Sequence, residues 1–426
     1  MAPTINAAGF DRRLAVVKSI INSHNLQASS IDTVAYDDSC PHPYNNFLFH
    51  VQLSPPASPS SFPGTQPGTE TAPADGLASF IIKLCNPDSG LNDTNRVENN
   101  VATHLLVRQA MREAQLPSLV PAIYAWGRHN DGIGSFAWTI SEFKPGVDLD
   151  SVFPSLSPVH QARLLHDIAA VLKALQTVRL PATVTEFGGL TFNKSGQIIS
   201  GEATLQKGEP EATYIACKQS SLLGALSRAE KSPVIQGWRR NDLNQRIQSF
   251  LEEGGLEKLF DRVDIHQKNL IHGDFTLNNM MFDTQKGELT AIIDFDWSCI
   301  SNPAEEFLSG LYDVGGNISD ERDKFHESII SGSFDVLSSA VQDEETRKEW
   351  DLAKAWNSAM KSTGCTRPSE ISGIRQILGV QKLQSLLCPF QLSNPHRLER
   401  MSDETKAEAL AKAEAALTEW LQKHGF

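Results

Sequence analysis

The feature that most restricts this chain is a run of polar residues and short apolar segments between residues 270 and 296. Asp274 is followed five positions later by Asn279, and the apolar run 289–293, which reads as a strand, ends at Asp294. Mg²⁺ prefers oxygen ligands of this kind, and a carboxylate can accept the proton of a hydroxyl. The combination favours an active site that moves a phosphoryl group, because that reaction mainly requires a positioned metal and an aligned acceptor.

The same residues resemble the catalytic loop of kinases, in which His-x-Asp precedes Asn and a metal-binding Asp follows a hairpin. In detail they are similar to the aminoglycoside phosphotransferase and choline-kinase-like family, which has glycine, here Gly273, where protein kinases have arginine. The resemblance implies that Asp274 is the catalytic base and that His272 stabilises its loop. It also implies that Asn279 and Asp294 bind Mg²⁺ and the ATP phosphates. The alternative is that these polar residues only occupy turns, which Asp and Asn favour.

The resemblance covers most of residues 30–390, and the layout is closest to fungal members of the family. It implies an α+β, bilobal, protein-kinase-like fold with a small antiparallel-sheet lobe and a mainly helical lobe. Residues 1–29 are predicted to contain an amino-terminal helix, and residues 30–143 to form the sheet lobe. Residues 144–426 are predicted to form the helical lobe with the catalytic loop and the acceptor pocket.

Within the sheet lobe, alternating apolar and polar residues predict five strands and one helix. The strands are expected at 31–37, 46–53, 77–85, 122–127 and 135–142, and the helix begins near Asn95. Residues 54–76 are crowded with Ser, Pro, Thr and Gly, so we expect them to bury almost nothing and to form a flexible insertion between two strands.

Lys83 closes the third predicted strand and is the expected counter-charge for nucleotide phosphates. The alternative is an edge lysine that discourages aggregation. Its ion-pair partner should lie on the following helix, where the family has glutamate but this chain has Asn100. Glu98 lies about 200° around the helix and cannot replace that glutamate without a shift of register. Either Asn100 hydrogen-bonds Lys83, or the lysine has another partner.

The predicted phosphate loop, residues 37–46, contains no glycine. Asn45 and Asn46 could cap phosphate oxygens through their amides, and Asn46 matches a position where the family often has asparagine. The alternative is an Asx turn that enters a strand. The two lobes are predicted to join near Glu142 and Phe143, at the end of the fifth predicted strand. The backbone at these residues would bond adenine.

Three acidic residues follow the predicted metal strand. Asp296 stands where protein kinases have the glycine of Asp-Phe-Gly and could set a second metal or the loop. Glu305 and Glu306 follow Pro303 at a helix start, where the helix dipole and the free backbone amides favour carboxylates. The alternative for this pair is the binding of a substrate amine.

Composition and charge restrict the partners. The formal net charge of −13 argues against nucleic acid, because phosphate backbones attract an excess of Lys and Arg. The six cysteines form no CxxC pattern, which indicates a reduced, intracellular protein. The chain lacks a signal-peptide pattern and an apolar stretch of membrane-spanning length, so we expect a cytoplasmic monomer that does not bind membranes.

The sequence therefore predicts an ATP- and Mg²⁺-dependent kinase that acts on a hydroxyl of a small molecule. The acceptor would be an amino alcohol, an amino sugar or a secondary-metabolite intermediate. The first alternative is a pseudokinase or nucleotide-binding module that has lost rate, which Asn100 and the absent glycines motivate. The second is a metal-dependent hydrolase that uses His266, His272 and Asp274, although no HxH or HExxH pattern supports it.

Overall fold

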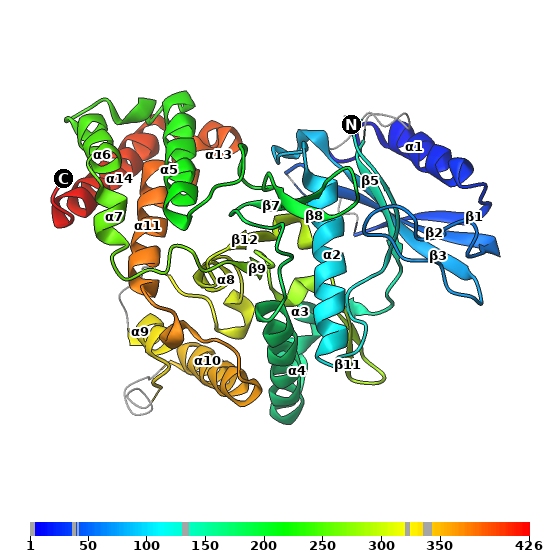
Figure 1. Ribbon diagram of the computed structural model, residues 1–426. Helices are drawn as coiled ribbons and strands as arrows, with labels where there is room; N and C mark the ends of the chain where they lie inside the picture. The colour runs from blue at the N-terminus through cyan, green and yellow to red at the C-terminus, as the bar shows by residue number, and fades with distance from the viewer. Residues whose placement is uncertain (1–4, 36–39, 41, 130–135, 320–323, 335–342) are drawn as a thin grey trace.

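A computed structural model describes most of the chain and shows two lobes lying beside each other (Figure 1). One lobe contains a five-stranded antiparallel sheet, and the other consists mainly of helices, so the predicted α+β, bilobal fold is confirmed. The described residues are 5–35, 40, 42–129, 136–319, 324–334 and 343–426.

The strands of the first lobe lie in the order β1-β2-β3-β5-β4. Along β2, the side chains of Phe47, Phe49 and Val51 are buried, and Leu48 between them pairs with Lys83 of β3. This period of two turns the aromatic residues toward a core and leaves Lys83 on the opposite face of the sheet. The strands are β1 (Ala28–Val34), β2 (Asn46–Ala57), β3 (Leu77–Cys85), β4 (Ile123–Gly127) and β5 (Trp138–Glu142).

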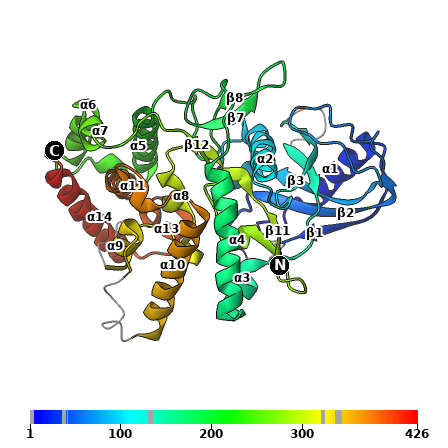
Figure 2. The same ribbon diagram turned by 60° about the horizontal axis from the view of Figure 1, so that its bottom comes forward.

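Two helices pack against this sheet, and the second also contacts the helical lobe. α1 (Phe10–Ser23) places Val17 and Ile20, both fully buried, in the core beneath β2 and β3. α2 (Arg96–Glu113) stands between the sheet and the helical lobe in both views (Figures 1 and 2). Most of α2 is buried, and its apolar side chains, such as Val101, belong to the large core of the helical lobe. Its position is therefore set by packing on both sides.

The Ser- and Pro-rich insertion between β2 and β3 packs against the sheet lobe. Phe62 is only 1% exposed and belongs to the core. The Gln66 side chain bonds the backbone of Trp126 in both directions, with N···O distances of 2.8 and 3.1 Å. Glu70 forms a two-pronged ion pair with Arg108 of α2, with both N···O distances at 2.8 Å. The expectation that this segment buries almost nothing is wrong, because one aromatic anchor and paired polar side chains replace a continuous apolar pattern.

The helical lobe begins after β5 and also contains three small sheets. α4 illustrates its construction: Pro158 occupies the first turn, the hydroxyl of Ser157 accepts the backbone N–H of His160, and Leu165, Ile168 and similar side chains at helical spacing enter the core. The longer helices are α4 (Pro158–Gln176), α5 (Tyr214–Lys231), α6 (Leu243–Glu252), α9 (Lys324–Ser331), α10 (Glu344–Thr363), α11 (Ile374–Leu387) and α14 (Asp403–Lys423).

Short elements complete this lobe and carry the loops of the site. β10 pairs with β11 and β6, β9 pairs with β12, and β7 pairs with β8. α3 has only four residues, and β7 and β8 form an antiparallel hairpin. The elements are β6 (Val147–Asp148), α3 (Leu149–Val152), β7 (Gly189–Phe192), β8 (Ile198–Gly201), α7 (Gly255–Leu259), β9 (Asn269–Ile271), β10 (Met280–Asp283), β11 (Glu288–Ile292), β12 (Cys299–Ser301), α8 (Ala304–Ser309), α12 (Phe390–Ser393) and α13 (Pro395–Glu399).

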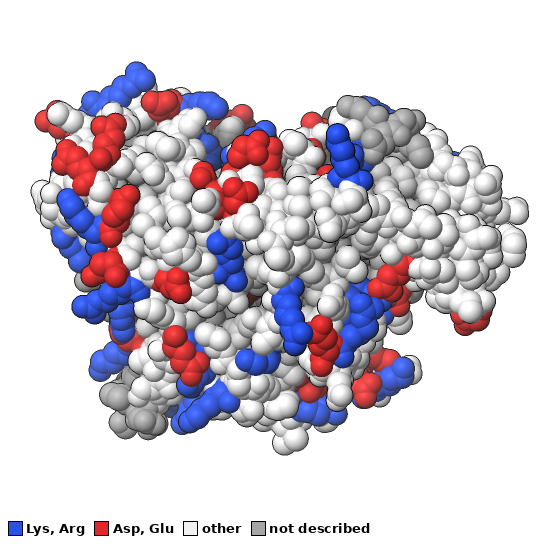
Figure 3. Space-filling view, viewed as in Figure 1, with Lys and Arg blue, Asp and Glu red and all other residues white. Residues whose placement is uncertain are grey.

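Charged side chains are distributed unevenly over the face seen in Figure 3. Acidic and basic residues alternate over the helical lobe, whereas the sheet lobe is mostly uncharged on this face. Among the described residues on this face, the basic side chains do not form a continuous surface. Within the described ranges, no helix is both long enough and apolar enough to cross a membrane.

The packed insertion makes a testable contribution to stability. We expect Phe62→Ala to lower the free energy of unfolding by about 3–5 kcal/mol, because it leaves a cavity in the sheet-lobe core. Phe390→Ala is the matched control, since that ring is 60% exposed. Denaturant unfolding followed by tryptophan fluorescence would measure both. Equal losses for the two variants would show that the insertion does not contribute to the core.

Candidate active site

The predicted catalytic loop runs from the end of β9 to the start of β10. Gly273 has a φ of +81°, and a Cβ built there would lie 2.5 Å from the carbonyl oxygen of Trp297, so only glycine fits this turn. The turn brings Asp274 next to Asn279, whose side-chain amide donates to Asp274 Oδ2 and to the Asp274 backbone oxygen, both at 2.9 Å. The carboxylate is therefore oriented from within its own loop.

His272 is fully buried beneath this loop. Its Nε2 lies 3.1 Å from the carbonyl oxygen of Ile293, and its Nδ1 accepts the backbone N–H of Asp274 at 3.3 Å. Burial lowers the pKa of His272 to about 4, so the ring is neutral at physiological pH. Both ring nitrogens are engaged in fixing the loop to the strand that leads to Asp294. The ring is thus a structural support and offers no nitrogen for a metal.

Glu306 of α8 holds the same loop from the other side. Its Oε2 accepts the backbone N–H of His272 at 2.6 Å, and its Oε1 accepts that of Gly273 at 3.2 Å. Burial raises the pKa of Glu306 from 4.5 to about 7, although the two N–H donors oppose this. Glu305, its neighbour, pairs instead with Lys218 at 2.5 Å. Sequence reasoning placed both carboxylates at a helix start and did not reveal these distant partners.

Asp294 follows β11 in a left-handed backbone conformation, with a φ of 61°. The backbone N–H of Ile293 donates to the Asn279 carbonyl at 2.9 Å and so joins the segment after β11 to the loop that carries Asp274. Asp294 Oδ1 is buried and has no hydrogen-bond partner among the described residues. Burial, followed by the negative charge of Asp296, raises the pKa of Asp294 to about 6. A buried carboxylate oxygen without a donor fits a cation, so the residues present suit a metal ion here.

Lys83 is paired with Asp296, which lies two residues beyond Asp294. The Lys83 Nζ to Asp296 Oδ1 distance is 2.5 Å, and the Asp296 side chain is only 3% exposed. Burial opposes ionisation of Asp296, but Lys83 and Arg96 hold its pKa well below the usual range. The amide of Asn100 reaches the same oxygen at 3.3 Å. The lysine thus has a carboxylate partner from the helical lobe, and Asn100 is the neighbour of that pair.

Arg96 is a residue that sequence reasoning missed. Its side chain is fully buried, and its Nη2 donates to Asp296 Oδ2 at 2.8 Å. The available signal was its position four residues before Asn100, which puts both on one face of the helix. Glu98 points elsewhere and pairs with Arg128 at 2.6 Å.

Asn46 lies at the start of β2 and joins the same cluster. Its amide donates to Asp296 Oδ2 at 2.8 Å, and its oxygen accepts from Arg96 at 2.9 Å. A cavity of about 250 Å³ is lined by Asn45, Asn46 and Asp294 together with residues of α1, β1 and β2. Of the predicted phosphate loop, residues 37–39 and 41 lie outside the described residues. The structure therefore brings Asn46 and Asp294 to one cavity. Lys83 is linked to Asn46 because both bond the carboxylate of Asp296.

A family comparison identifies the chain. The model of the phosphotransferase enzyme family (APH) matches residues 74–328, more than half of the sequence. The chain belongs to this family. The resemblance read from the catalytic loop is thereby confirmed, while a search of curated protein sequences finds no match.

Several solved structures are similar to this phosphotransferase. ADP-bound aminoglycoside phosphotransferase APH(2'')-Ib has 12% identity and a TM-score of 0.46, with 95% of this chain and 98% of that chain covered. The gentamicin complex of APH(2'')-IIa has 14% identity and a TM-score of 0.46, with 95% of each chain covered. Plasmodium vivax ethanolamine kinase has 12% identity and a TM-score of 0.38, with 91% and 82% covered.

The predicted link between the lobes lies at the end of β5. The backbone N–H of Glu142 donates to the Ala122 carbonyl at 2.8 Å, and the Glu142 side chain pairs with Lys144 at 2.7 Å. The ring of Phe143 is 36% exposed and stacks on His50 of β2, with ring centroids 4.1 Å apart. Glu142 therefore has structural partners, and Phe143 presents an aromatic surface beside β2.

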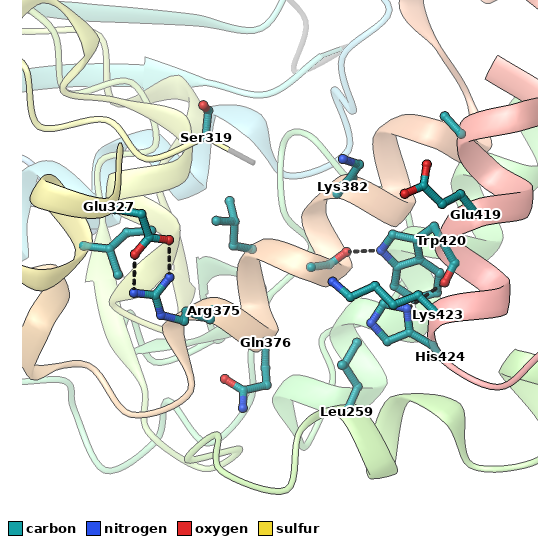
Figure 4. Close-up of a pocket in the computed structure, with 14 residues that line it drawn as sticks. Leu259, Ser319, Glu327, Arg375, Gln376, Lys382, Glu419, Trp420, Lys423 and His424 are labelled. Carbon is teal, nitrogen blue, oxygen red and sulfur yellow. Dashed lines mark hydrogen bonds and ion pairs between the residues drawn. The ribbon is translucent and has the colours of Figure 1, made fainter. Parts of the chain in front are cut away.

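A cavity of about 650 Å³ lies elsewhere in the phosphotransferase, among α7, α9, α11 and α14 (Figure 4). Its wall includes the two-pronged ion pair of Glu327 with Arg375, at 2.6 and 2.7 Å, and the buried ring of Trp420. None of its lining residues belongs to the catalytic loop, β3 or the metal strand. This cavity is thus separate from the cluster around Asp294.

The raised pKa of Glu306 predicts a pH-dependent contribution to stability. The folded protein holds the Glu306 proton more tightly than the unfolded chain, so this contribution is complete below pH 4.5 and is lost as the pH rises through about 7. Relative to Glu306→Gln, the parent should lose roughly 3 kcal/mol of unfolding free energy over that range.

Unfolding of both proteins at a series of pH values would measure this difference. Glu408→Gln, at an exposed position of α14, is the matched control and should follow the parent at every pH. A difference between the parent and Glu306→Gln that stays flat or grows as the pH rises would contradict the buried, proton-retaining carboxyl.

Proposed function

We propose that this phosphotransferase transfers the γ-phosphoryl group of ATP, with Mg²⁺, to a hydroxyl of a small molecule. One observation carries the proposal: Asp274 is held by the amide of Asn279, and the strand that ends at Asp294 is bonded to the same asparagine. A proton acceptor and a cation site are thus built on one hydrogen-bonded unit. Phosphoryl transfer depends on this kind of positioning more than on covalent chemistry by the protein.

Asp274 is the proposed base. Its Oδ2 accepts from Asn279, which leaves Oδ1 to receive the proton of the acceptor hydroxyl as that hydroxyl attacks the phosphorus. Burial raises the pKa of Asp274 and makes it a better proton acceptor than an exposed aspartate. The hydrogen bond from Asn279 prevents rotation of the carboxylate, so the free oxygen keeps one direction.

Asp294 and the side-chain oxygen of Asn279 would hold Mg²⁺, since Asp294 Oδ1 is buried without a donor among the described residues. A bound magnesium ion would supply positive charge to the phosphate oxygens. The ammonium of Lys83, whose side chain is 13% exposed, would bind the phosphates from the sheet lobe. The Asn46 amide, Asp296 and Arg96 keep that lysine in place.

The surroundings of Asp274 favour an acceptor that carries an amine. Asp313 Oδ2 accepts the backbone N–H of Leu277 in the catalytic loop, and its Oδ1 is buried without a partner in the described part of the chain. Burial raises the pKa of Asp313 to about 6, so it is mainly ionised at neutral pH. An ammonium group on an amino alcohol or amino sugar would satisfy this oxygen.

The alternatives have weaker support. The pseudokinase hypothesis was motivated by Asn100 and by the absence of glycine from residues 37–46, but Lys83 has a carboxylate partner in Asp296. The hydrolase hypothesis used His266, His272 and Asp274, and both ring nitrogens of His272 are engaged in the loop. An active small-molecule kinase therefore remains the best-supported function.

We expect Asp274→Asn to lower turnover by on the order of 10²–10⁴, because the amide cannot accept the hydroxyl proton. ATP binding should survive, since Asp274 does not hold the nucleotide in this proposal. ATP consumption against a panel of amino alcohols and amino sugars, with calorimetry for nucleotide binding, would measure both. Asp75→Asn, in an exposed loop, is the control. Parent-like turnover in Asp274→Asn would remove Asp274 from the role of base.

Asp294→Ala should abolish Mg²⁺-dependent ATP binding, because it removes the proposed carboxylate ligand. Titration of ATP with and without Mg²⁺ separates metal-dependent from metal-independent binding. The parent should bind more tightly with Mg²⁺, and the variant should show no such gain. A gain that persists in Asp294→Ala would show that the metal is held elsewhere.

A further inference from the structure

We propose that Asp296 is the positioning residue for Lys83, in the role that a glutamate at position 100 of α2 would otherwise have, and that Arg96 is its second buried counter-charge. The inference rests on the proposed function only in assuming that Lys83 binds nucleotide phosphates. Asp296 comes from the helical lobe, two residues after Asp294, whereas its partners Lys83 and Arg96 come from the sheet lobe and α2.

The two oxygens of Asp296 have separate tasks. Oδ1 accepts from Lys83 Nζ at 2.5 Å and from the Asn100 amide at 3.3 Å. Oδ2 accepts from Arg96 Nη2 and from the Asn46 amide, both at 2.8 Å. Oδ1 thus orients the lysine. Oδ2 is held by Arg96 and Asn46, and those two hydrogen bonds involve no nucleotide contact. The carboxylate is fixed on one side so that it can fix Lys83 on the other.

Burial makes the ion pairs of Asp296 with Lys83 and Arg96 necessary, because the charged groups are removed from water. The side chains of Arg96 and Asp296 are 0% and 3% exposed, and Lys83 is 13% exposed. A buried cation is stable only when it is paired, and Asn100 contributes a neutral amide. Asp296 is therefore the carboxylate that pairs with both cations, and Arg96 has a second ion pair with Asp93 at 3.3 Å. Without Asp296, Lys83 would have no ion-pair partner among the described residues.

The position of Asn100 shows why a carboxylate on α2 could take the role of Asp296 beside Lys83. Its amide nitrogen lies on the same Asp296 oxygen as Lys83 Nζ, so the two nitrogens are neighbours. A glutamate at position 100 has one more methylene than asparagine and would bring its carboxylate into the place that Asp296 Oδ1 now occupies. The neutral Asn100 on α2 is thus accompanied by the charged Asp296 on the segment after β11.

The arrangement couples the lysine to the metal strand. Asp294 and Asp296 lie in one short segment, so a displacement of that segment would move both the proposed metal ligand and the partner of Lys83. α2 is tied to the same region through Asn99, whose amide donates to the Ser298 carbonyl at 2.8 Å. Asp296 thus ties Lys83 and Asn46 of the sheet lobe to the segment that carries Asp294.

The test removes the carboxylate of Asp296 and places one at position 100 of α2. Asp296→Asn removes the charge, Asp296→Asn/Asn100→Glu restores it from α2, and Asp296→Asn/Asn100→Gln is the matched neutral control. The KM for ATP should rise by roughly tenfold or more in Asp296→Asn and in the Gln control. In the Glu variant it should return to within about threefold of the parent.

A second measurement does not depend on activity. Reductive methylation of Lys83 at about pH 8, followed by mass spectrometry of its peptide, reports how readily its ammonium loses a proton. The reaction should be faster in Asp296→Asn and in the Gln control than in the parent, and slower again in the Glu variant. This order would hold even if the parent did not consume ATP, in which case the proposed function alone would fail.

The outcomes separate clearly. Parent-like methylation of Lys83 in Asp296→Asn would overturn the inference, and so would equal behaviour of the Glu and Gln variants. If Asp296→Asn does not fold, thermal unfolding of the two double variants decides, and the Glu variant should be the more stable. Failure of the Glu variant to fold, or a lower melting temperature than the Gln variant, would also contradict the proposal.

Discussion

The arrangement of the two lobes depends on one buried carboxylate, Asp296, which lies between two cations. Asp296 is bonded at once to Lys83, Arg96 and Asn46, residues that lie between 200 and 250 positions away in the sequence. Removing three charged groups from water is unfavourable unless their hydrogen bonds are well made, and here every oxygen of the carboxylate has at least two donors. This cluster therefore sets where the sheet lobe, α2 and the segment after β11 meet.

The loop before β2 contains no glycine, and side chains from other parts of the chain hold its backbone. The side chain of Asn6 accepts the backbone N–H of Tyr44 at 2.9 Å, and the amide of Asn86 donates to the Tyr44 carbonyl at 2.7 Å. Arg96 donates to the Asn45 carbonyl at 2.7 Å. Side chains from three other segments of the chain thus hold the backbone of Tyr44 and Asn45, which a glycine-rich loop would shape by its own conformational freedom.

Local patterns were predictable because their causes are local. β3 occupies the predicted residues 77–85, since alternation along one strand reveals its buried face. The pairing of Asp274 with Asn279 follows from a five-residue turn with Gly273 at its bend. The burial of Phe62 was missed, because a segment rich in Ser and Pro can be anchored by one ring and by polar bonds that composition does not reveal.

The sequence by itself determined the family, the two-lobed α+β fold and the pairing of Asp274 with Asn279, because these two residues lie in one short loop. Only the tertiary structure decided which carboxylate balances Lys83 and that Arg96 shares it. The physical reason is that a buried ion pair joins side chains by their position in space. Spacing along the chain therefore could not distinguish Asp296 from other carboxylates.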